Sequence, residues 1–206
     1  MKIMLDVSPK RLAEKSEQFD YDFWQLRTPL TSNAISDAPY GLDNGCFKRF
    51  DQKTWERMLD ECFEIKMPKF VCLPDIVGNA QRTIELFKEF ELRTNGLPRA
   101  LVLQDGINHV TIDWSKVSAV FVGGSDAFKI SPDALQTCKA AKMLGKWVHV
   151  GRVNTVERLA NWIDIADSID GSGISKYDYM LQEVVSFVKG DHCFDKNISL
   201  FAAEAS

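Results

Sequence analysis

Short apolar runs that end in Asp or Gly alternate with amphipathic stretches along most of the chain. The runs are rich in β-branched and aromatic residues, and continuous apolar character of this kind is typical of parallel strands that are covered on both faces. The pattern predicts eight strands, over residues 2–7, 22–28, 40–43, 70–75, 100–105, 119–124, 147–152 and 166–170.

The stretches between several of these runs have the apolar spacing of helices. Capping residues mark some of the starts: Thr54 for the first helix, Ser131 with Pro132 for the third, and Asn154 or Thr155 for the fourth. We predict helices over residues 54–65, 80–93, 132–144, 155–165 and 177–188.

Eight strands with intervening helices predict an α/β fold, a compact (β/α)8 TIM-like barrel. The chain has 206 residues, which suits a single domain over residues 1–206 in which some connections lack a full helix. A doubly wound open sheet is the structural alternative.

Composition narrows the class of protein. Hydrophobic residues make up 45% of the chain and charged residues 26%, as in ordinary globular proteins. The formal net charge of −4 gives no overall attraction to nucleic acid, so such binding needs a local basic patch. The chain has no apolar run of about 18 residues, and its start, MKIMLDV, is too short for a signal peptide. We therefore expect a cytoplasmic protein, in the host cytoplasm if the gene is viral, with no membrane partner.

The cysteines show no metal-binding or disulfide pattern. None of the five forms a CxxC or CxC pair, which excludes the common zinc frameworks and argues against a disulfide scaffold. We expect no metal and no other cofactor, and a packing role for Cys46. The five are Cys46, Cys62, Cys72, Cys138 and Cys193.

Polar residues collect at the C-terminal ends of the predicted strands. In a barrel these ends form one face, where active sites are built. Asp and Gly also end strands simply as turn formers, but their presence on several separate strands favours one common pocket. The residues at these ends are Asp43, Asp75, Gln104, Asp105, Gly123, Gly124, Arg152, Asn154, Asp167 and Asp170.

Two of these segments have the features of a backbone cradle. Gly123 and Gly124 allow main chain to approach a ligand closely, and Arg152 stands just ahead of a capped helix, as in an anion site. Each also has an ordinary interpretation, as a turn or as a surface arginine. His149 alternates with Trp147 in a strand, which favours a hydrogen-bonded histidine in the barrel interior.

Taken in order, the strand-end motifs resemble those of the tRNA-guanine transglycosylases. The match is closest to the shorter DNA-directed branch, the 7-deazaguanine DNA transglycosylases of some viruses and bacteria, and extends over about residues 40–177. LDNGCF (42–47) is similar to the family's Asp-Ser-Gly-Gly-Phe segment, and ADSIDG (166–171) to its Asp-x-Phe-Asp-Cys segment. The other motifs are LPDIVGNA (73–80), VLQDG (102–106), VGGS (122–125) and HVGRVNT (149–155).

The resemblance implies roles for the matching residues. Asp170 matches the nucleophile that attacks C1′ of the nucleoside, and Asp43 matches the carboxylate that handles protons on the leaving and arriving bases. Exchange with retained configuration needs such a pair. The residues that this match implies for substrate binding are Asp75, Gln104, Gly123, Gly124, Asn44 and Asp167.

The chain departs from the tRNA enzymes after the nucleophile. Only His192 and Cys193 stand in the region of their three-cysteine, one-histidine zinc site, and SGISKY (172–177) replaces their Pro-Thr-Arg signature. A barrel without a zinc subdomain favours DNA over tRNA as the partner.

The resemblance also implies a free 7-deazaguanine as the incoming base, such as 7-cyano-7-deazaguanine. A helper protein or a second copy of the chain is a further candidate partner. Separately from the resemblance, the position of Arg152 ahead of a capped helix, with Lys129 and Lys176 at neighbouring strand ends, predicts these three as phosphate contacts. Lys139, Lys142 and Lys146 are the other cations available to a groove.

Three other functions remain open. An N-glycosidase would use the same carboxylates with water as the acceptor. A barrel lyase or isomerase would bind a small sugar phosphate at GRVNT (151–155), although that class uses a strand-end Lys or Glu that the sequence does not clearly offer. A non-catalytic binding protein would make Asp43 and Asp170 dispensable.

Overall fold

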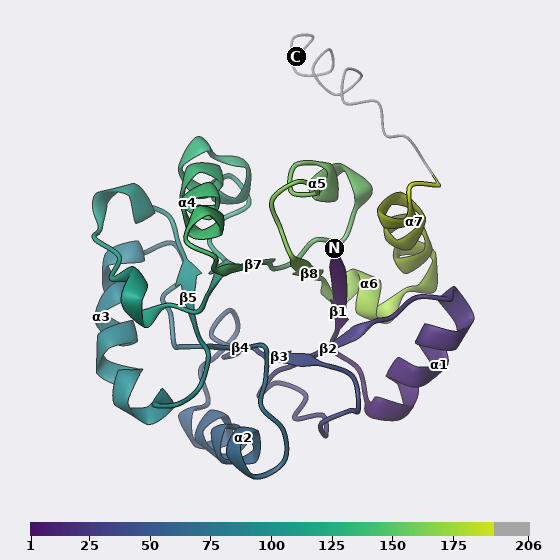
Figure 1. Cartoon of the computed structure of the whole chain (residues 1–206), viewed down its shortest axis with the longest axis horizontal. Helices are drawn as coiled ribbons and strands as arrows, with labels where there is room; N and C mark the ends of the chain where they lie inside the picture. The colour runs from purple at the N-terminus through teal and green to yellow at the C-terminus, as the bar shows by residue number, and fades with distance from the viewer. Residues whose placement is uncertain (192–206) are drawn as a thin grey trace, which may run out of the picture.

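Eight parallel strands close into a barrel in their order along the chain (Figure 1). The computed structural model describes residues 1–191. The barrel confirms the predicted fold, and the open-sheet alternative is wrong because β1 pairs with β8. The strands are β1 (Lys2–Leu5), β2 (Trp24–Arg27), β3 (Tyr40–Leu42), β4 (Phe70–Cys72), β5 (Arg99–Leu103), β6 (Ala119–Val122), β7 (Trp147–Val150) and β8 (Ser168–Asp170).

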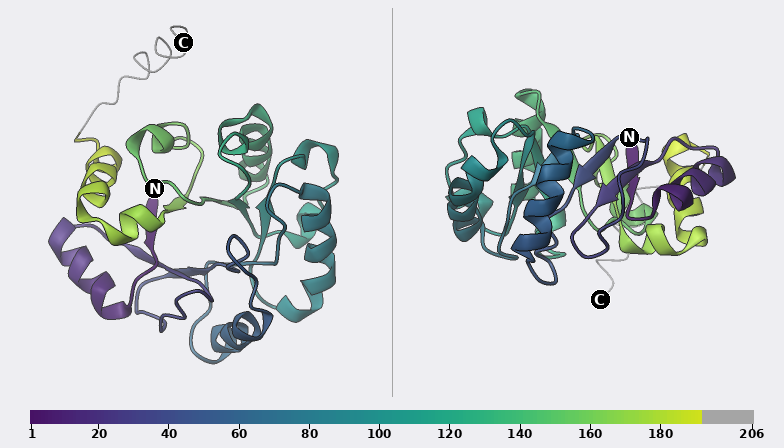
Figure 2. Two further views of the ribbon diagram at one scale, coloured as in Figure 1. Left: turned by 180° about the vertical axis from the view of Figure 1, so that it is seen from behind. Right: turned by 90° about the horizontal axis from the view of Figure 1, so that it is seen from below.

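Helices surround the strands, and the side view shows them standing alongside the barrel (Figure 2). Four predicted helices are confirmed with slightly different ends, whereas α5 stops well short of residue 165. The α-helices are α1 (Pro9–Phe19), α2 (Gln52–Glu64), α3 (Ala80–Phe90), α4 (Pro132–Met143), α5 (Val156–Ala160), α6 (Ser172–Lys176) and α7 (Asp178–Lys189). Short 3-10 turns are η1 (Glu91–Thr94), η2 (Ile107–His109), η3 (Trp114–Lys116) and η4 (Phe128–Ile130).

Capping explains where the helices begin. Ser131 caps α4 with Pro132 as its first residue, and Thr155 caps α5, as predicted. The prediction of Thr54 as a cap is wrong: Asp51 caps α2 by accepting a hydrogen bond from the Thr54 backbone N–H at 3.1 Å. An ionised carboxylate also suits the positive end of the helix dipole.

Helix α1 is an element that the sequence pattern did not predict. Its sequence is mostly polar, and Lys15 on its inner face is buried. The Lys15 ammonium pairs with Asp178 of α7 at 2.5 Å, so an ion pair joins α1 to the neighbouring α7 (Figure 1). The start at Ser8 and Pro9 was the available signal, because Ser8 caps the helix and Pro9 opens it.

The interior of the barrel is packed with side chains. Inward residues of the strands form an apolar cluster that includes Met4, Phe70 and Val102. At the N-terminal end of the barrel, the indoles of Trp24 and Trp147 stack with their ring centroids 5.5 Å apart. These layers fill the N-terminal end of the barrel, so a site is expected at the C-terminal ends of the strands.

The β2–β3 connection contains no helix, and buried polar groups replace the missing packing. The Gln25 amide donates to the backbone O of Ala34 at 2.9 Å, and the Arg27 guanidinium donates to the backbone O of Asn33 at 2.8 Å. Arg27 also pairs with Glu61 of α2 at 2.6 Å. Two outward-facing polar side chains thus hold the loop against the sheet.

No helix among residues 1–191 is long and apolar enough to cross a membrane.

Gly41 tests how tightly the interior is packed. A Cβ at this position would lie 2.5 Å from Cζ of Phe70. We expect Gly41→Ala to lower the free energy of unfolding by about 1–3 kcal/mol, since overpacking forces ring and backbone apart. Urea denaturation measures the change. The same substitution should cost less in a Phe70→Leu background, and an equal cost in both backgrounds would contradict the proposed collision.

Candidate active site

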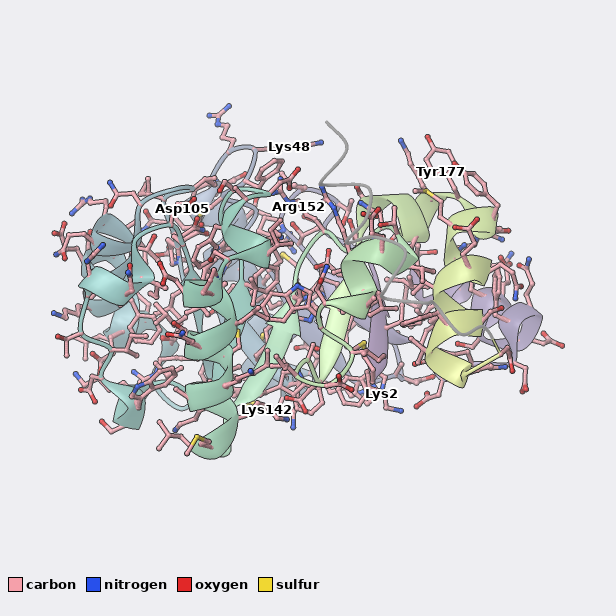
Figure 3. The ribbon with its side chains drawn as sticks, turned by 90° about the horizontal axis from the view of Figure 1, so that it is seen from above. Lys2, Lys48, Asp105, Lys142, Arg152 and Tyr177 are labelled. Carbon is pink, nitrogen blue, oxygen red and sulfur yellow. The ribbon has the colours of Figure 1, made fainter. Side chains whose placement is uncertain are left out.

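Most of the predicted site residues lie together at the C-terminal end of the barrel. Asp43 directly follows β3, Asp75 follows β4, Gln104 follows β5, and Asp170 is the last residue of β8. Figure 3 shows this end at the top, with Arg152 on its rim, and the opposite end below. We call this top opening the mouth of the barrel; its residues are Asp6, Asp43, Asp75, Gln104, Lys129, Arg152 and Asp170.

The predicted placement of Asp167 in this site is wrong. Asp167 precedes β8, so it lies at the opposite end of that three-residue strand from Asp170. Its carboxylate accepts the Val148 backbone N–H at 2.8 Å and pairs with Lys142 at 2.6 Å. Lys142 is labelled at the lower end of the barrel in Figure 3. Lys146, which precedes β7, is also excluded from a groove at the mouth.

A cavity of about 320 Å³ lies at this lower end, lined in part by Lys69, Trp147 and Asp167. A second cavity of about 440 Å³ lies beside α3, lined in part by Phe87 and Ile112. Neither includes the carboxylates of the mouth.

Asp170 is held from two sides. His149 Nε2 lies 3.0 Å from Asp170 Oδ1, and the Asp170 backbone O accepts the Val153 N–H at 2.6 Å. The side chain is 14% exposed, so it reaches the mouth without being free in solvent. The prediction of His149 as a hydrogen-bonded interior histidine is confirmed.

The glycines after Asp170 make room for the neighbouring loop. A Cβ at Gly171 would collide with Asn154 Oδ1 and the backbone O of Val153. Asn154 Oδ1 in turn accepts the Gly173 N–H at 2.7 Å, so it fixes the start of α6. The side chain of Asp170 is therefore placed by a close fit between the loops after β7 and β8.

Asp43 occupies a different electrostatic environment. Its backbone N–H continues the ladder by donating to the Arg27 backbone O at 2.8 Å, and Oδ2 accepts the Gly45 N–H at 3.3 Å. Burial, together with the negative charges of Asp170 and Asp75, raises the pKa of Asp43 to about 7. This carboxyl group can therefore both hold and release a proton near neutral pH.

Asp75 lies in a network of amide groups. Its Oδ1 accepts the Asn44 side-chain amide at 2.8 Å, and its Oδ2 accepts the Gln104 amide at 2.6 Å. Gln104 is 1% exposed, and its own Oε1 accepts the Gly78 N–H at 2.9 Å. Burial raises the pKa of Asp75, whereas the hydrogen bonds from Asn44, Cys46 and Gln104 lower it. The predicted substrate-binding trio is thus brought together and pre-oriented.

Asp6 is a mouth residue that the sequence analysis missed. Its Oδ1 accepts hydrogen bonds from Thr31 at 2.7 Å and Asn33 at 2.9 Å. Burial is the largest cause that raises its pKa, and repulsion from Asp170 adds to it. The prediction extended the first strand through Val7, but β1 ends at Leu5, so Asp6 is a strand-end carboxylate like the others.

Arg152 lies at the rim in a strained backbone conformation. Its φ of 61° is in the left-handed region, which is costly for a side chain other than Gly. The guanidinium donates to the Gly124 backbone O at 3.1 Å and stacks on Phe47, with its carbon 4.2 Å from the ring centroid. Arg152 therefore joins the loops after β3, β6 and β7.

Lys129 is buried, although a surface position was predicted for it. It is 6% exposed, and its Nζ donates to the backbone oxygens of Val122 and Gly151. Burial, followed by repulsion from Arg152, lowers the pKa of Lys129 to about 8, whereas attraction to Asp170 opposes the shift. The prediction that Lys129 contacts a phosphate is therefore wrong. Lys176, at the end of α6, is exposed as a phosphate contact requires.

Gly123 and Gly124 are required by the fold itself. A Cβ at Gly123 would lie 2.8 Å from Gln104 Nε2, and one at Gly124 would lie 2.9 Å from Asp105 Oδ2. Gly124 also has a φ of 72°. The pair thus keeps the loop after β6 close to Gln104, independently of any ligand.

Within residues 1–191, no group of three or more His, Cys, Asp or Glu side chains could hold a metal ion. His192 and Cys193 lie outside the described residues. Burial raises the pKa of the Cys46 thiol to about 12, which suits the predicted packing role better than a nucleophilic one.

Comparison with models of known protein families finds no match for this chain, and comparison with curated protein sequences finds none either.

The pKa of Asp43 provides a direct test of the charge coupling across the mouth. Asp170→Asn removes a neighbouring negative charge that raises the Asp43 pKa, so Asp43 should release its proton at lower pH. Carboxyl ¹³C shifts in aspartate-labelled protein measure the titration, and loss of one signal in Asp43→Asn assigns it.

Asp22→Asn is the matched control, because Asp22 pairs with Lys2 at the lower end of the barrel. It should leave the Asp43 titration unchanged. An Asp43 pKa that is the same in wild type and Asp170→Asn would show that the two carboxylates do not interact.

Proposed function

We propose that this barrel is a DNA base-exchange enzyme, which replaces guanine by a 7-deazaguanine through a covalent Asp170–deoxyribose intermediate. The observation that supports this most directly is the contrast between Asp170 and Asp43. Asp170 accepts a hydrogen bond from a buried imidazole and lies near the Lys129 ammonium, whereas the pKa of Asp43 is raised to about 7. A nucleophile and an acid/base group need such different surroundings.

The first half of the reaction forms the glycosyl ester. An oxygen of Asp170 attacks C1′, the bond from C1′ to the guanine nitrogen breaks, and its electron pair stays on the departing base. Asp43 in its acid form gives that base a proton. The products are a free guanine, an ionised Asp43 and a sugar linked to Asp170.

The second half reverses these roles. The incoming 7-deazaguanine attacks C1′ through its ring nitrogen, the Asp43 carboxylate takes the proton of that nitrogen, and the ester bond to Asp170 breaks. Both carboxyl groups return to their starting states, and two inversions at C1′ retain its configuration. No oxidant, reductant or energy source is consumed.

The network around Asp75 suits recognition of the guanine edge. Carboxylate oxygens accept from the N1–H and 2-amino groups of guanine, and an amide such as that of Gln104 offers both a donor and an acceptor. Both side chains are held by neighbours before a base arrives. Because guanine and 7-deazaguanines share this edge, one site can serve both halves of the reaction.

DNA must present its target nucleotide outside the duplex, as a flipped base or a single strand. Two cations suit contact with the DNA phosphates. They are Arg152, which stacks on the exposed ring of Phe47, and the exposed Lys176. The net charge of −4 makes such local contacts necessary.

Hydrolysis is the second candidate, with water in place of the incoming base. Asp43 with a pKa of about 7 is equally suited to activate water. A lyase that uses an amine nucleophile fits less well, since the Lys129 amine is buried and donates to two backbone oxygens.

Substitution of the two carboxylates separates their roles. Asp170→Asn keeps the shape but cannot form the ester, so base exchange should fall by roughly 10³–10⁶-fold. Asp43→Asn should lose roughly 10²–10⁴-fold through impaired proton transfer. Incorporation of labelled guanine into DNA measures exchange, and a denaturing gel detects the covalent adduct.

Asp22→Asn, at the far end of the barrel, controls for loss of charge and should retain full activity. Full exchange activity in Asp170→Asn would overturn the proposal. Base release without incorporation would assign the hydrolytic alternative.

Arg152 provides a test of DNA binding in which side chain and backbone are separated. Arg152→Ala and Arg152→Gly both remove the guanidinium and should weaken binding to single-stranded DNA and lower its salt dependence. Only Arg152→Gly relieves the φ of 61°, so it should be the more stable variant by about 1 kcal/mol. Salt titrations and thermal unfolding measure the two effects, and an unchanged affinity in both variants would exclude a phosphate contact.

A further inference from the structure

A chain of hydrogen bonds runs inside the barrel from its lower end to Asp170. Trp147 Nε1 lies 2.8 Å from Ser168 Oγ, and the same Oγ lies 2.8 Å from His149 Nδ1. His149 Nε2 lies 3.0 Å from Asp170 Oδ1. The four residues alternate between β7 and β8, and the register pairs His149 with Ser168 directly. We call this chain the relay.

The donors and acceptors of the relay determine where each proton lies. The Trp147 indole can only donate, so Ser168 Oγ accepts its proton. The Ser168 hydroxyl then donates its own proton to His149 Nδ1, which must be unprotonated. The remaining imidazole proton lies on Nε2 and is donated to Asp170. A proton on Nδ1 would leave the Ser168 hydroxyl as a buried donor without an acceptor, which folded proteins avoid.

Packing prevents the imidazole from adopting another arrangement. His149 and Ser168 are both fully buried. The imidazole centroid lies 4.7 Å from the ring centroid of Phe121 and 5.0 Å from that of Phe70. A flipped ring would place carbon atoms opposite Ser168 and Asp170 and would break both hydrogen bonds.

We propose that Ser168, whose hydroxyl is oriented by Trp147, acts as a positioning residue, which holds His149 as the Nε2–H tautomer so that it fixes Asp170 with Oδ1 occupied and Oδ2 open to the mouth. The role of Oδ2 as the attacking oxygen rests on the proposed function, whereas the tautomer does not. Among residues 1–191, no side chain or backbone donor forms a hydrogen bond with Oδ2.

The tautomer can be measured on the resting protein without substrate. The chain has three histidines, so long-range ¹H–¹⁵N spectra of histidine-labelled protein contain three imidazoles, and His149→Gln identifies the one of interest. We expect a neutral Nε2–H ring for His149 in wild type. In Ser168→Ala this preference should be lost, and formation of the adduct on DNA should fall by about 10–100-fold, as is typical when an orienting partner is removed.

Two variants control for structural effects. Ser186→Ala removes a buried hydroxyl on α7, away from the relay, and should leave both the tautomer and adduct formation unchanged. Trp147→Phe removes the indole donor but leaves the Ser168 hydroxyl able to donate, so the tautomer should persist.

A doubly protonated or Nδ1–H ring for His149 in wild type would overturn the relay, whether or not Ser168→Ala folds. An unchanged tautomer in folded Ser168→Ala would also overturn it. If the Nε2–H ring is found but wild type forms no adduct, the relay stands and the base-exchange proposal fails.

Discussion

The pairing of β1 with β8 is the constraint on which the candidate site depends. Met4 pairs with Asp170 across this closure, and β8 is held on its other side by β7. With only three residues in β8, this double pairing leaves Asp170 no freedom to slide along the barrel axis. Closure also brings the loop after β1 to the same mouth, so that Asp6 and Asp170 affect each other electrostatically.

Closure of the barrel therefore concentrates negative charge at the mouth. Hydrogen-bond donors and a buried lysine there stabilise the carboxylates. Each carboxylate has donors of its own: Thr31 and Asn33 for Asp6, the Gly45 N–H for Asp43, amides for Asp75, and His149 for Asp170. Lys129 adds a buried positive charge near Asp170. Asp43 has only backbone donors, the N–H groups of Asn44 and Gly45, the latter at 3.3 Å. Burial, followed by repulsion from Asp170 and Asp75, favours the protonated form of Asp43, which is why its pKa rises.

The sequence could predict the barrel because strands covered on both faces are continuously apolar. It could also predict which strand ends bear carboxylates. It could not fix the strand ends to within two residues, and this limit explains both errors of placement: Asp6 was counted inside a strand and Asp167 at the wrong end of one. Successive side chains of a strand point to opposite faces, and the two ends of a strand lie at opposite ends of the barrel. An error of one or two residues in a predicted strand end therefore decides whether a residue belongs to the site.

The contacts between buried polar side chains were harder to predict than the strand ends on which those side chains lie. Lys129 and Lys15 look like surface cations in the sequence, yet both are buried by contacts with residues distant in the chain: Lys129 with Gly151, and Lys15 with Asp178. His149 was predicted to be buried, but its link to Asp170 needs the β7–β8 register, which hydrophobic patterning alone does not give. Patterning reports burial, whereas function here depends on which buried polar groups meet.

The internal hydrogen bonds of Asp75 bear on how selective the proposed site can be. Each carboxylate oxygen accepts one amide and the Cys46 thiol is a third partner, so of the about four lone-pair sites of a carboxylate about one remains for a base. In the proposed reaction, guanine fills this site with its N1–H or its 2-amino group, and Asn44 and Gln104 need not move. Adenine lacks both donors and would leave the remaining site of the buried Asp75 carboxylate without a donor. Sites built to pair a substrate donor reject analogues without it by about 10⁴–10⁵-fold. The same amides that hold Asp75 before a base arrives therefore make the wrong base costly, so the selectivity of the proposed reaction follows from the rigidity of the empty site.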